Sequence, residues 1–253
     1  MYYSANALGG MTVMNLTIGW LYPAQMNIYG DRGNVIALQR RASWRGMTVE
    51  IALIGFGDPV PAGVDVFFFG GGQDQEQVAV SKDLQGIKGH RIKRAVENGA
   101  SLLGICGGYQ LLGHVYRPHD AEPLPGIGLF DAETEAGHER FIGNVVIDTQ
   151  WGDLVGFENH SGLTYLAGDA RPMGAVRVGR GNNGKDKTEG ALWKHAIGCY
   201  LHGSVLPKNP ELTDWLIASA LKRRGYDDSL EPLDDTIESA AHASAVDRAV
   251  RTR

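Results

Sequence analysis

The residue best suited to covalent chemistry in this sequence is Cys106. It lies in the run Gly104-Ile105-Cys106-Gly107-Gly108, between an apolar segment that predicts a strand and a segment that predicts a helix. This is the pattern of a nucleophile elbow, in which small neighbours allow a sharp turn that exposes the nucleophile. A helix N-terminus beneath the sulfur favours the thiolate, and its N–H groups can stabilise an oxyanion. The alternative is a buried structural cysteine, which is the commoner role of an isolated cysteine, but the strand, elbow and helix context favours a nucleophile.

A nucleophilic cysteine needs a base, and His202 is the best placed of the eight histidines. It follows the predicted strand Ile197–Leu201 and precedes Gly203, so we expect it at a strand terminus, where a sheet gathers its site residues. Cys199 lies on the opposite face of that strand and is predicted to pack in the core. The remaining histidines are predicted to be surface or capping residues, without the spacing of a metal site: His90, His114, His119, His138, His160, His195 and His242.

A second glycine-rich turn, Gly70-Gly71-Gly72, follows the predicted strand just before the elbow strand. A glycine-rich turn is weak evidence by itself, because many α/β loops contain one. Its position next to the elbow strand predicts that the amides of Gly71 and Gly107 donate together to one oxyanion.

The segment Gly179–Asp186 imitates a phosphate-binding loop. It matches G-x-x-x-x-G-K but has Asp186 where Ser or Thr should bind Mg²⁺, and it joins two predicted short strands as a polar hairpin. ATP binding is therefore not expected there.

The elements that must position these residues alternate between strands and helices. Predicted strands cover Leu16–Tyr22, Thr48–Ile54, Val64–Phe69 and Ser101–Cys106. Predicted helices cover Asn34–Trp44, Asp74–Asn98 with breaks near Gly86 and Gly89, and Tyr109–Val115. Such alternation predicts an α/β fold with a mostly parallel central sheet covered by helices on both faces.

The chain changes character after Pro118, where glycine-rich turns separate short apolar runs. We predict a mixed or antiparallel extension there, with strands at Ile127–Phe130, Phe141–Ile147, Ala175–Val178, Ala191–Trp193 and Ile197–Leu201. An amphipathic helix is predicted over Asn209–Arg224. One domain is expected over residues 14–225, preceded by a non-native or disordered leader at 1–13 and followed by a weakly ordered or docking tail at 226–253.

Composition narrows the class of protein. The chain has 253 residues, 43% of them apolar, so it can fill the core of one large α/β domain. A net charge of −5 argues against a nucleic-acid binder. Two cysteines cannot form a disulfide scaffold, and no apolar run approaches the roughly 18 residues of a membrane span. A cytoplasmic protein with small-molecule or protein partners is expected.

Several motifs together resemble a known family. GICGGYQLLG (104–113) and CYLHG (199–203) resemble the class I, triad-type glutamine amidotransferases, in the cobyric acid synthase-like branch. NIYGDRGN (27–34), GFENHSGLTYL (156–166) and YLHGSVLPKNPELTDWL (200–216) resemble the glutaminase subunits of lipid II isoglutaminyl synthases. The resemblance runs from about Met14 to Arg224 and implies a single flavodoxin-like domain.

The resemblance also implies roles for individual residues. Cys106 would attack the side-chain amide of L-glutamine, and His202 would take and return the proton, with Gly71 and Gly107 as oxyanion donors. Gln110 occupies the family's substrate-contacting position. Arg140 matches the arginine that pairs with the glutamine carboxylate, and its alternative is a solvated loop charge.

The resemblance implies a partner as well. The wider family has glutamate where this chain has Ser204, and a Mur ligase-like synthetase subunit (MurT type) would lend the missing carboxylate in a heterodimer. That partner would hold ATP and Mg²⁺ and amidate the D-glutamate α-carboxyl of lipid II, so no cofactor or metal is expected on this chain. Three alternatives stay open: ammonia supply to another amidation such as the cobyric acid type, a stand-alone cysteine γ-glutamyl hydrolase, and a non-catalytic binding module.

Overall fold

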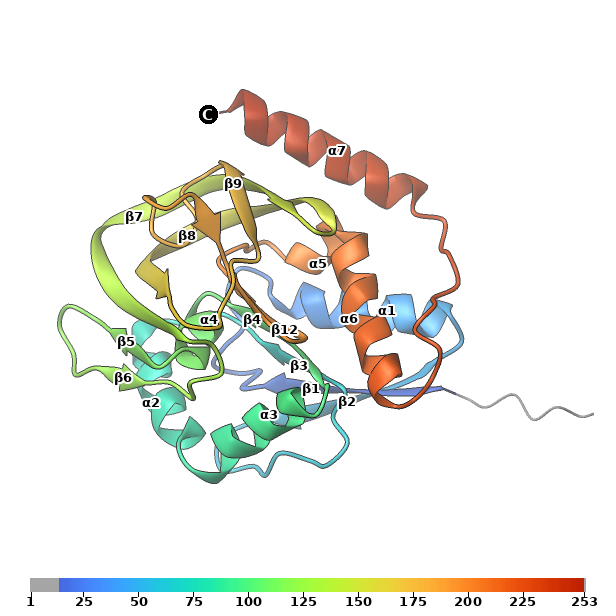
Figure 1. The fold of residues 1–253 in the computed structure, drawn as a ribbon, viewed down its shortest axis with the longest axis horizontal. Coiled ribbons are helices and arrows are strands. Elements are labelled where there is room, and N and C mark those ends of the chain that lie inside the picture. The colour runs from blue at the N-terminus through green and yellow to red at the C-terminus, as the bar shows by residue number, and fades with distance from the viewer. Residues whose placement is uncertain (1–13, 253) are drawn as a thin grey trace, which may run out of the picture.

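The computed structural model of the chain describes residues 14–252 and shows two sheets joined by one hydrophobic core (Figure 1). The expected leader at 1–13 lies outside the described residues. None of the helices in the described part of the chain is long and apolar enough to cross a membrane.

The first sheet is the predicted parallel one. Its order is β2-β1-β3-β4-β12, with β11 added antiparallel at the edge beside β12. The strands are β1 (Asn15–Leu21), β2 (Thr48–Ile54), β3 (Val66–Phe69), β4 (Ser101–Ile105), β11 (Ala191–Trp193) and β12 (Ala196–Cys199). All four residues of β3 are buried, as expected of a central strand covered on both faces.

The helices cover both faces of this sheet. The connection from β1 to β2 and the connection from β3 to β4 run in opposite directions along the sheet, and right-handed crossovers therefore place their helices on opposite faces. α1 (Arg32–Trp44), α5 (Val205–Lys208) and α6 (Pro210–Arg223) contact one another on one face. α2 (Asp74–Leu84), α3 (Ile87–Glu97) and α4 (Gly107–Leu112) lie on the other (Figure 1). The predicted break at Gly86 is confirmed, whereas Gly89 lies inside α3.

The second sheet is the mixed extension, but the strands predicted there at Ala191–Trp193 and Ile197–Leu201 instead join the first sheet as β11 and β12. It contains β5 (Val115–Arg117), β6 (Leu124–Pro125), β7 (Ala132–Thr149), β8 (Gly152–Leu166), β9 (Gly174–Val178) and β10 (Thr188–Glu189). The predicted strand Phe141–Ile147 is only the second half of β7. β8 was not predicted, because it is formed by pairing with almost the whole of β7 and the local sequence does not show this pairing.

The strand predicted at Ile127–Phe130 is wrong. Its backbone N–H groups bond to the last turn of α4, with Ile127 N donating to Leu111 O at 3.0 Å and Leu129 N to Leu112 O at 2.8 Å. This apolar run therefore caps a helix instead of joining a sheet.

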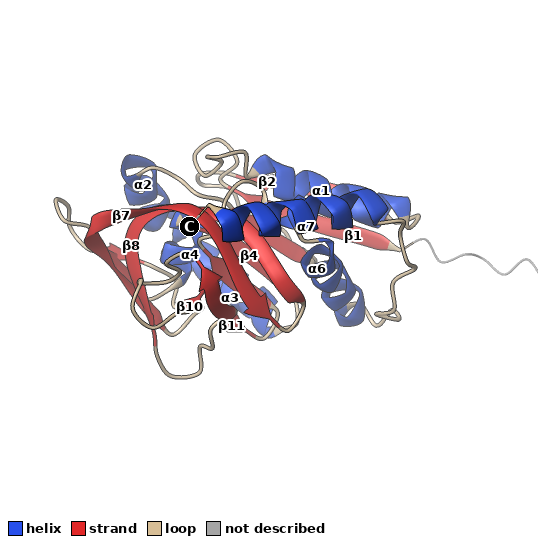
Figure 2. Cartoon of the chain, turned by 90° about the horizontal axis from the view of Figure 1, so that it is seen from above, coloured by secondary structure: helices blue, strands red, loops and turns tan. Residues whose placement is uncertain are grey.

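The C-terminal segment is held against the domain by charges and by a small apolar cluster. Arg41 of α1 bonds both Asp214 of α6 and Asp235, at 2.6 and 2.5 Å. Beyond Asp235, α7 (Thr236–Arg251) places Ala249 among Val146, Val155 and Val178 of the second sheet. Figures 1 and 2 show α7 lying across the outer side of these strands.

Candidate active site

Cys106 and His202 meet at the carboxyl edge of the parallel sheet because their strands are neighbours. β4 and β12 pair in parallel, with Ile105 opposite Cys199, and Cys106 N donates to Cys199 O at 2.8 Å. The nucleophile candidate thus follows one strand directly, and the histidine follows the adjacent strand by three residues.

Cys106 has the backbone of a strained elbow. Its φ is 50°, a value that residues with a side chain rarely adopt, and α4 begins at the next residue. Glycine is required at position 108, where a β-carbon would lie 2.5 Å from the carbonyl oxygen of Phe69. The cysteine is 8% exposed and forms part of a pocket wall, so the sulfur is accessible to a ligand.

The surroundings of His202 favour the protonated form of its imidazole. It is 1% exposed, and neither ring nitrogen has a hydrogen-bond partner among residues 14–252. Burial alone would lower its pKa, but the neighbouring Cys106 and Asp31 outweigh burial and raise the pKa of His202 to about 10. These neighbours therefore favour the imidazolium form of His202 at neutral pH.

Asp31 is the functional residue that sequence reasoning missed. It is fully buried, its Oδ1 lies 3.8 Å from Nδ1 of His202, and Oδ1 has no hydrogen-bond partner in the described chain. Its loop leaves β1 beside β3, at the point where the strand order reverses and α/β sheets commonly bind ligands. An acidic residue in the polar segment NIYGDRGN after a buried strand was the signal that could have found it.

Ser204 cannot replace the missing family glutamate, because its hydroxyl donates to Gly30 O at 2.5 Å. The chain instead has a carboxylate of its own beside His202, on the loop that Ser204 contacts.

The glycine amides predicted to bind an oxyanion differ in availability. Gly71 N donates to Oδ2 of Asp31 at 2.7 Å, so this amide already has a buried acceptor. The amides of Gly72 and Gly107 have no acceptor within the described residues, and a β-carbon on Gly107 would lie 3.2 Å from Gly72 N. Gly72, which lines the pocket, is better placed than Gly71 to act with Gly107.

Gln110 lines the same pocket and its amide is fixed by a chain of buried hydrogen bonds. Gln77 Nε2 donates to Gln110 Oε1 at 2.8 Å, and Gln110 Nε2 donates to the hydroxyl of Tyr200 at 3.3 Å. Tyr200 in turn shares a 2.7 Å hydrogen bond with Thr164. The amide orientation of Gln110 is therefore set by its surroundings.

Arg140 lies in β7, within the irregular stretch between Ala136 and Phe141; it is exposed and lines the pocket with Cys106. One guanidinium nitrogen donates to Oδ1 of Asn159 at 3.0 Å. Asn159 then donates to the hydroxyl of Tyr29 at 2.8 Å, and the Tyr29 ring contacts His202 with 4.8 Å between ring centroids. These contacts link the second sheet to the loop that carries Asp31.

His160 corrects the expectation that the other histidines lie at the surface. It is 2% exposed on β8, stacks on Tyr200 with 3.6 Å between centroids, and bonds Gly162 O through Nδ1 at 2.8 Å. Burial lowers the pKa of His160 to about 3, so this ring is neutral. Its ring neighbours come from the hairpin partner β7 and from the segment after β12, which the spacing of FENH alone does not reveal.

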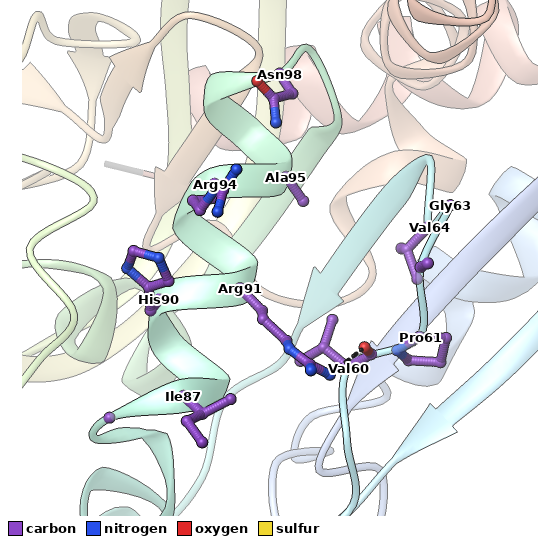
Figure 3. A pocket seen from close by; sticks show the side chains of 12 residues that line it. Val60, Pro61, Gly63, Val64, Ile87, His90, Arg91, Arg94, Ala95 and Asn98 are labelled. Carbon is purple, nitrogen blue, oxygen red and sulfur yellow. Dashed lines mark hydrogen bonds between the residues drawn. The ribbon is translucent and has the colours of Figure 1, made fainter.

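The pocket that joins these residues has a volume of about 760 Å³, and its walls include Cys106, Gln110, Arg140, Asn159 and His160. A second cavity of about 730 Å³ lies between α3 and the segment before β3 (Figure 3). That cavity is lined by His90, Arg91, Arg94, Asn98 and apolar residues but has no cysteine, so it is separate from the candidate chemistry.

Glu189, behind the site, gives a test of the buried electrostatics. Burial raises the pKa of Glu189 to about 8, and Glu158 adds to the shift although the amide of Tyr200 opposes it. Because the unfolded carboxyl releases its proton near pH 4.5, this group's stabilisation is lost as the pH rises from there to about 8. We expect Glu189→Gln to lose less thermal stability than wild type between pH 5 and 8.5 in scanning calorimetry. Identical pH profiles would contradict the protonated assignment.

Comparison with known proteins identifies relatives. Residues 17–210 match the CobB/CobQ-like glutamine amidotransferase domain. "Lipid II isoglutaminyl synthase (glutamine-hydrolyzing) subunit GatD" of Staphylococcus aureus is 41% identical over 94% of this chain and 98% of its own length. The Streptococcus pneumoniae protein of the same name is 36% identical over 94% of this chain and 93% of its own. Among solved structures, PurLQS from Thermotoga maritima has a TM-score of 0.58 at 15% identity, covering 81% of this chain and 98% of that one.

Proposed function

The chain belongs to the CobB/CobQ-like glutamine amidotransferases and, among them, to the GatD family, and from this premise we propose that it is the glutaminase subunit of a lipid II isoglutaminyl synthase. The observation that carries the proposal is a cysteine at a strained elbow in a pocket wall, next to a buried histidine held in its charged form. Likeness over nearly the full length of the GatD relatives supports the same conclusion.

The reaction begins with attack of the Cys106 thiolate on the side-chain amide carbon of L-glutamine. The amides of Gly107 and Gly72 face the negative charge that develops on the amide oxygen. The imidazolium of His202 then donates a proton to the departing nitrogen, ammonia leaves, and a thioester remains.

Neutral His202 next accepts a proton from water, which attacks the thioester. Glutamate is released, and the thiolate and imidazolium are restored together. Throughout this cycle Asp31, 3.8 Å from the imidazole, acts as a positioning residue that stabilises its charged form.

Ammonia would pass to a Mur ligase-like partner of the MurT type, which would use ATP and Mg²⁺ to activate the D-glutamate α-carboxyl of lipid II. Support for a partner comes from the names of the GatD relatives, which describe subunits. Cytoplasmic assembly with that partner is part of the proposal.

The decisive experiment supplies amide-¹⁵N glutamine to the purified chain, alone and together with the MurT-type subunit, ATP, Mg²⁺ and lipid II. We expect ¹⁵N in the amidated product, together with covalent labelling of the Cys106 peptide by diazo-oxo-norleucine. Hydrolysis of γ-glutamyl peptides by the chain alone would support the stand-alone hydrolase instead. An amidated product without ¹⁵N, or no labelling of Cys106, would contradict the proposal.

Arg140 gives a test of substrate binding. Its guanidinium would pair with the glutamine α-carboxylate in place of Asn159, so Arg140→Ala should raise the glutamine KM at least about tenfold, equivalent to about 1.4 kcal/mol. Steady-state kinetics should show a much smaller change in kcat. Arg94→Ala, at the cavity on α3, is the matched control, and a KM as low as that control's would leave Arg140 without a binding role.

A further inference from the structure

Besides Cys106, the lining of the active-site pocket includes one carboxyl and one guanidinium side chain. Among its lining residues, Asp74 is the one carboxyl group and Arg140 the one guanidinium, and the buried ring of His160 is neutral. The remaining lining is formed by amide, hydroxyl, apolar and backbone groups together with Cys106. A pocket with one carboxylate and one guanidinium complements a ligand that has one positive and one negative group.

Glutamine has that charge pattern at one end only. Its α-carbon bears an ammonium and a carboxylate, whereas its reacting amide is neutral. We propose that Asp74 binds the α-ammonium of glutamine while Arg140 binds the α-carboxylate; this assignment rests on the proposed glutaminase function. Asp74 would thereby make the site specific for an α-amino acid over other primary amides.

Asp74 stands at the start of α2, whose first turn lines the pocket. It is the first residue of α2, separated by Gln73 alone from the glycine turn that follows β3. Gln77 lies one turn later on the same face of α2, lines the same pocket, and fixes Gln110 through its 2.8 Å hydrogen bond. The first turn of α2 therefore faces the pocket that contains the sulfur.

Tyr116 shows that Asp74, Arg140 and Cys106 surround a common region. Its side chain lines the pocket, and its hydroxyl has no hydrogen-bond partner among the described residues. The pKa of Tyr116 is raised to about 12, mainly by burial and also by Asp74 and Cys106, while Arg140 acts to lower it. All three groups thus act on one hydroxyl.

Asp74 has no other partner that would account for its place in the pocket wall. It is exposed, and its carboxylate forms no hydrogen bond or ion pair with any residue in the range 14–252. A carboxylate in the first turn of a helix is favourable for the helix dipole, so a role in stability alone is the competing explanation. Only the binding role predicts that the effect of replacing Asp74 depends on whether the substrate has an α-ammonium group.

The test compares glutamine with 4-carbamoylbutanoate, which lacks only the α-ammonium, in the complex with the synthetase partner. Asp74→Asn should raise the KM for glutamine about tenfold or more and leave the KM for 4-carbamoylbutanoate within about twofold of wild type. The preference for glutamine should fall accordingly. Asp74→Glu, which keeps the charge, should restore part of that preference.

Asp120→Asn, an exposed carboxylate that does not line the pocket, is the matched control and should behave as wild type. Equal losses with both substrates and a lower unfolding midpoint would assign Asp74 to helix stability and overturn the inference. An unchanged glutamine KM would also overturn it. A wild-type complex that releases no ammonia from glutamine would overturn the proposed function itself, and this assignment with it.

Discussion

Cys106→Ala should abolish ammonia production from glutamine, lowering the rate by at least about three orders of magnitude, because no thioester can form without the sulfur. The same variant, assembled with the synthetase subunit, should still amidate lipid II when ammonium salts replace glutamine. Comparing the two nitrogen donors distinguishes a catalytic from a structural role of Cys106, because only amidation with glutamine requires the thioester at Cys106. Mass spectrometry of the amidated product with each donor gives the measurement.

Cys199→Ala is the matched control for that experiment. Cys199 is fully buried one strand away, and burial raises the pKa of its thiol well above the ordinary value. Its loss should leave glutamine-dependent amidation near wild type at a modest cost in stability. Equal loss of activity with both donors in Cys106→Ala would show that Cys106 has a structural role.

Asp31→Asn should lower kcat for glutamine by about 100-fold, the scale of an impaired acid–base group. Asp31 helps to raise the pKa of His202 to about 10 against the effect of burial, so a neutral asparagine should lower that pKa. Because the imidazolium must protonate the departing nitrogen, activity should then be lost at lower pH on the alkaline side. The pH profile of kcat records this shift, which a general loss of stability would not produce.

Arg32→Lys, at an exposed neighbour of Asp31, is the control for disturbance of the loop and should keep the wild-type profile. A fall in kcat without any movement of the alkaline limit would assign Asp31 to support of Gly71 through its 2.7 Å hydrogen bond. Wild-type kinetics in Asp31→Asn would mean that the carboxylate acting on His202 comes from elsewhere.

The parallel sheet could be predicted from the sequence because its strands are short apolar runs separated by helical segments. β2 begins and ends at the predicted residues, and α6 differs from its prediction by one residue at each end. The long hairpin β7–β8 could not be predicted in the same way. Its outer half is mostly polar and is held as a strand by distant pairing, from Ala132 with Leu166 to Ala136 with Gly162.

The residues of the candidate site likewise fall into those that local sequence predicts and those that depend on distant contacts. Cys106 and His202 follow from local patterns, a glycine elbow and a strand end, which the neighbouring pairing of β4 and β12 then brings together. Asp31 and His160 depend on contacts between distant segments, and neither has a local motif that marks burial. The availability of the Gly71 amide could not be predicted either, since its acceptor, Asp31, lies 40 residues earlier in the chain.

The two halves of the site are anchored differently, and this bears on how the subunit could be regulated. Cys106 and His202 emerge from hydrogen-bonded neighbours in the rigid central sheet, so their spacing resists deformation. Arg140 and Asn159 belong to the hairpin β7–β8, and Tyr29 belongs to a surface loop. A protein that bound to the hairpin or the loop would change the affinity for glutamine and leave the reactivity of the sulfur nearly constant. Regulation would then alter KM rather than the rate of the chemical step.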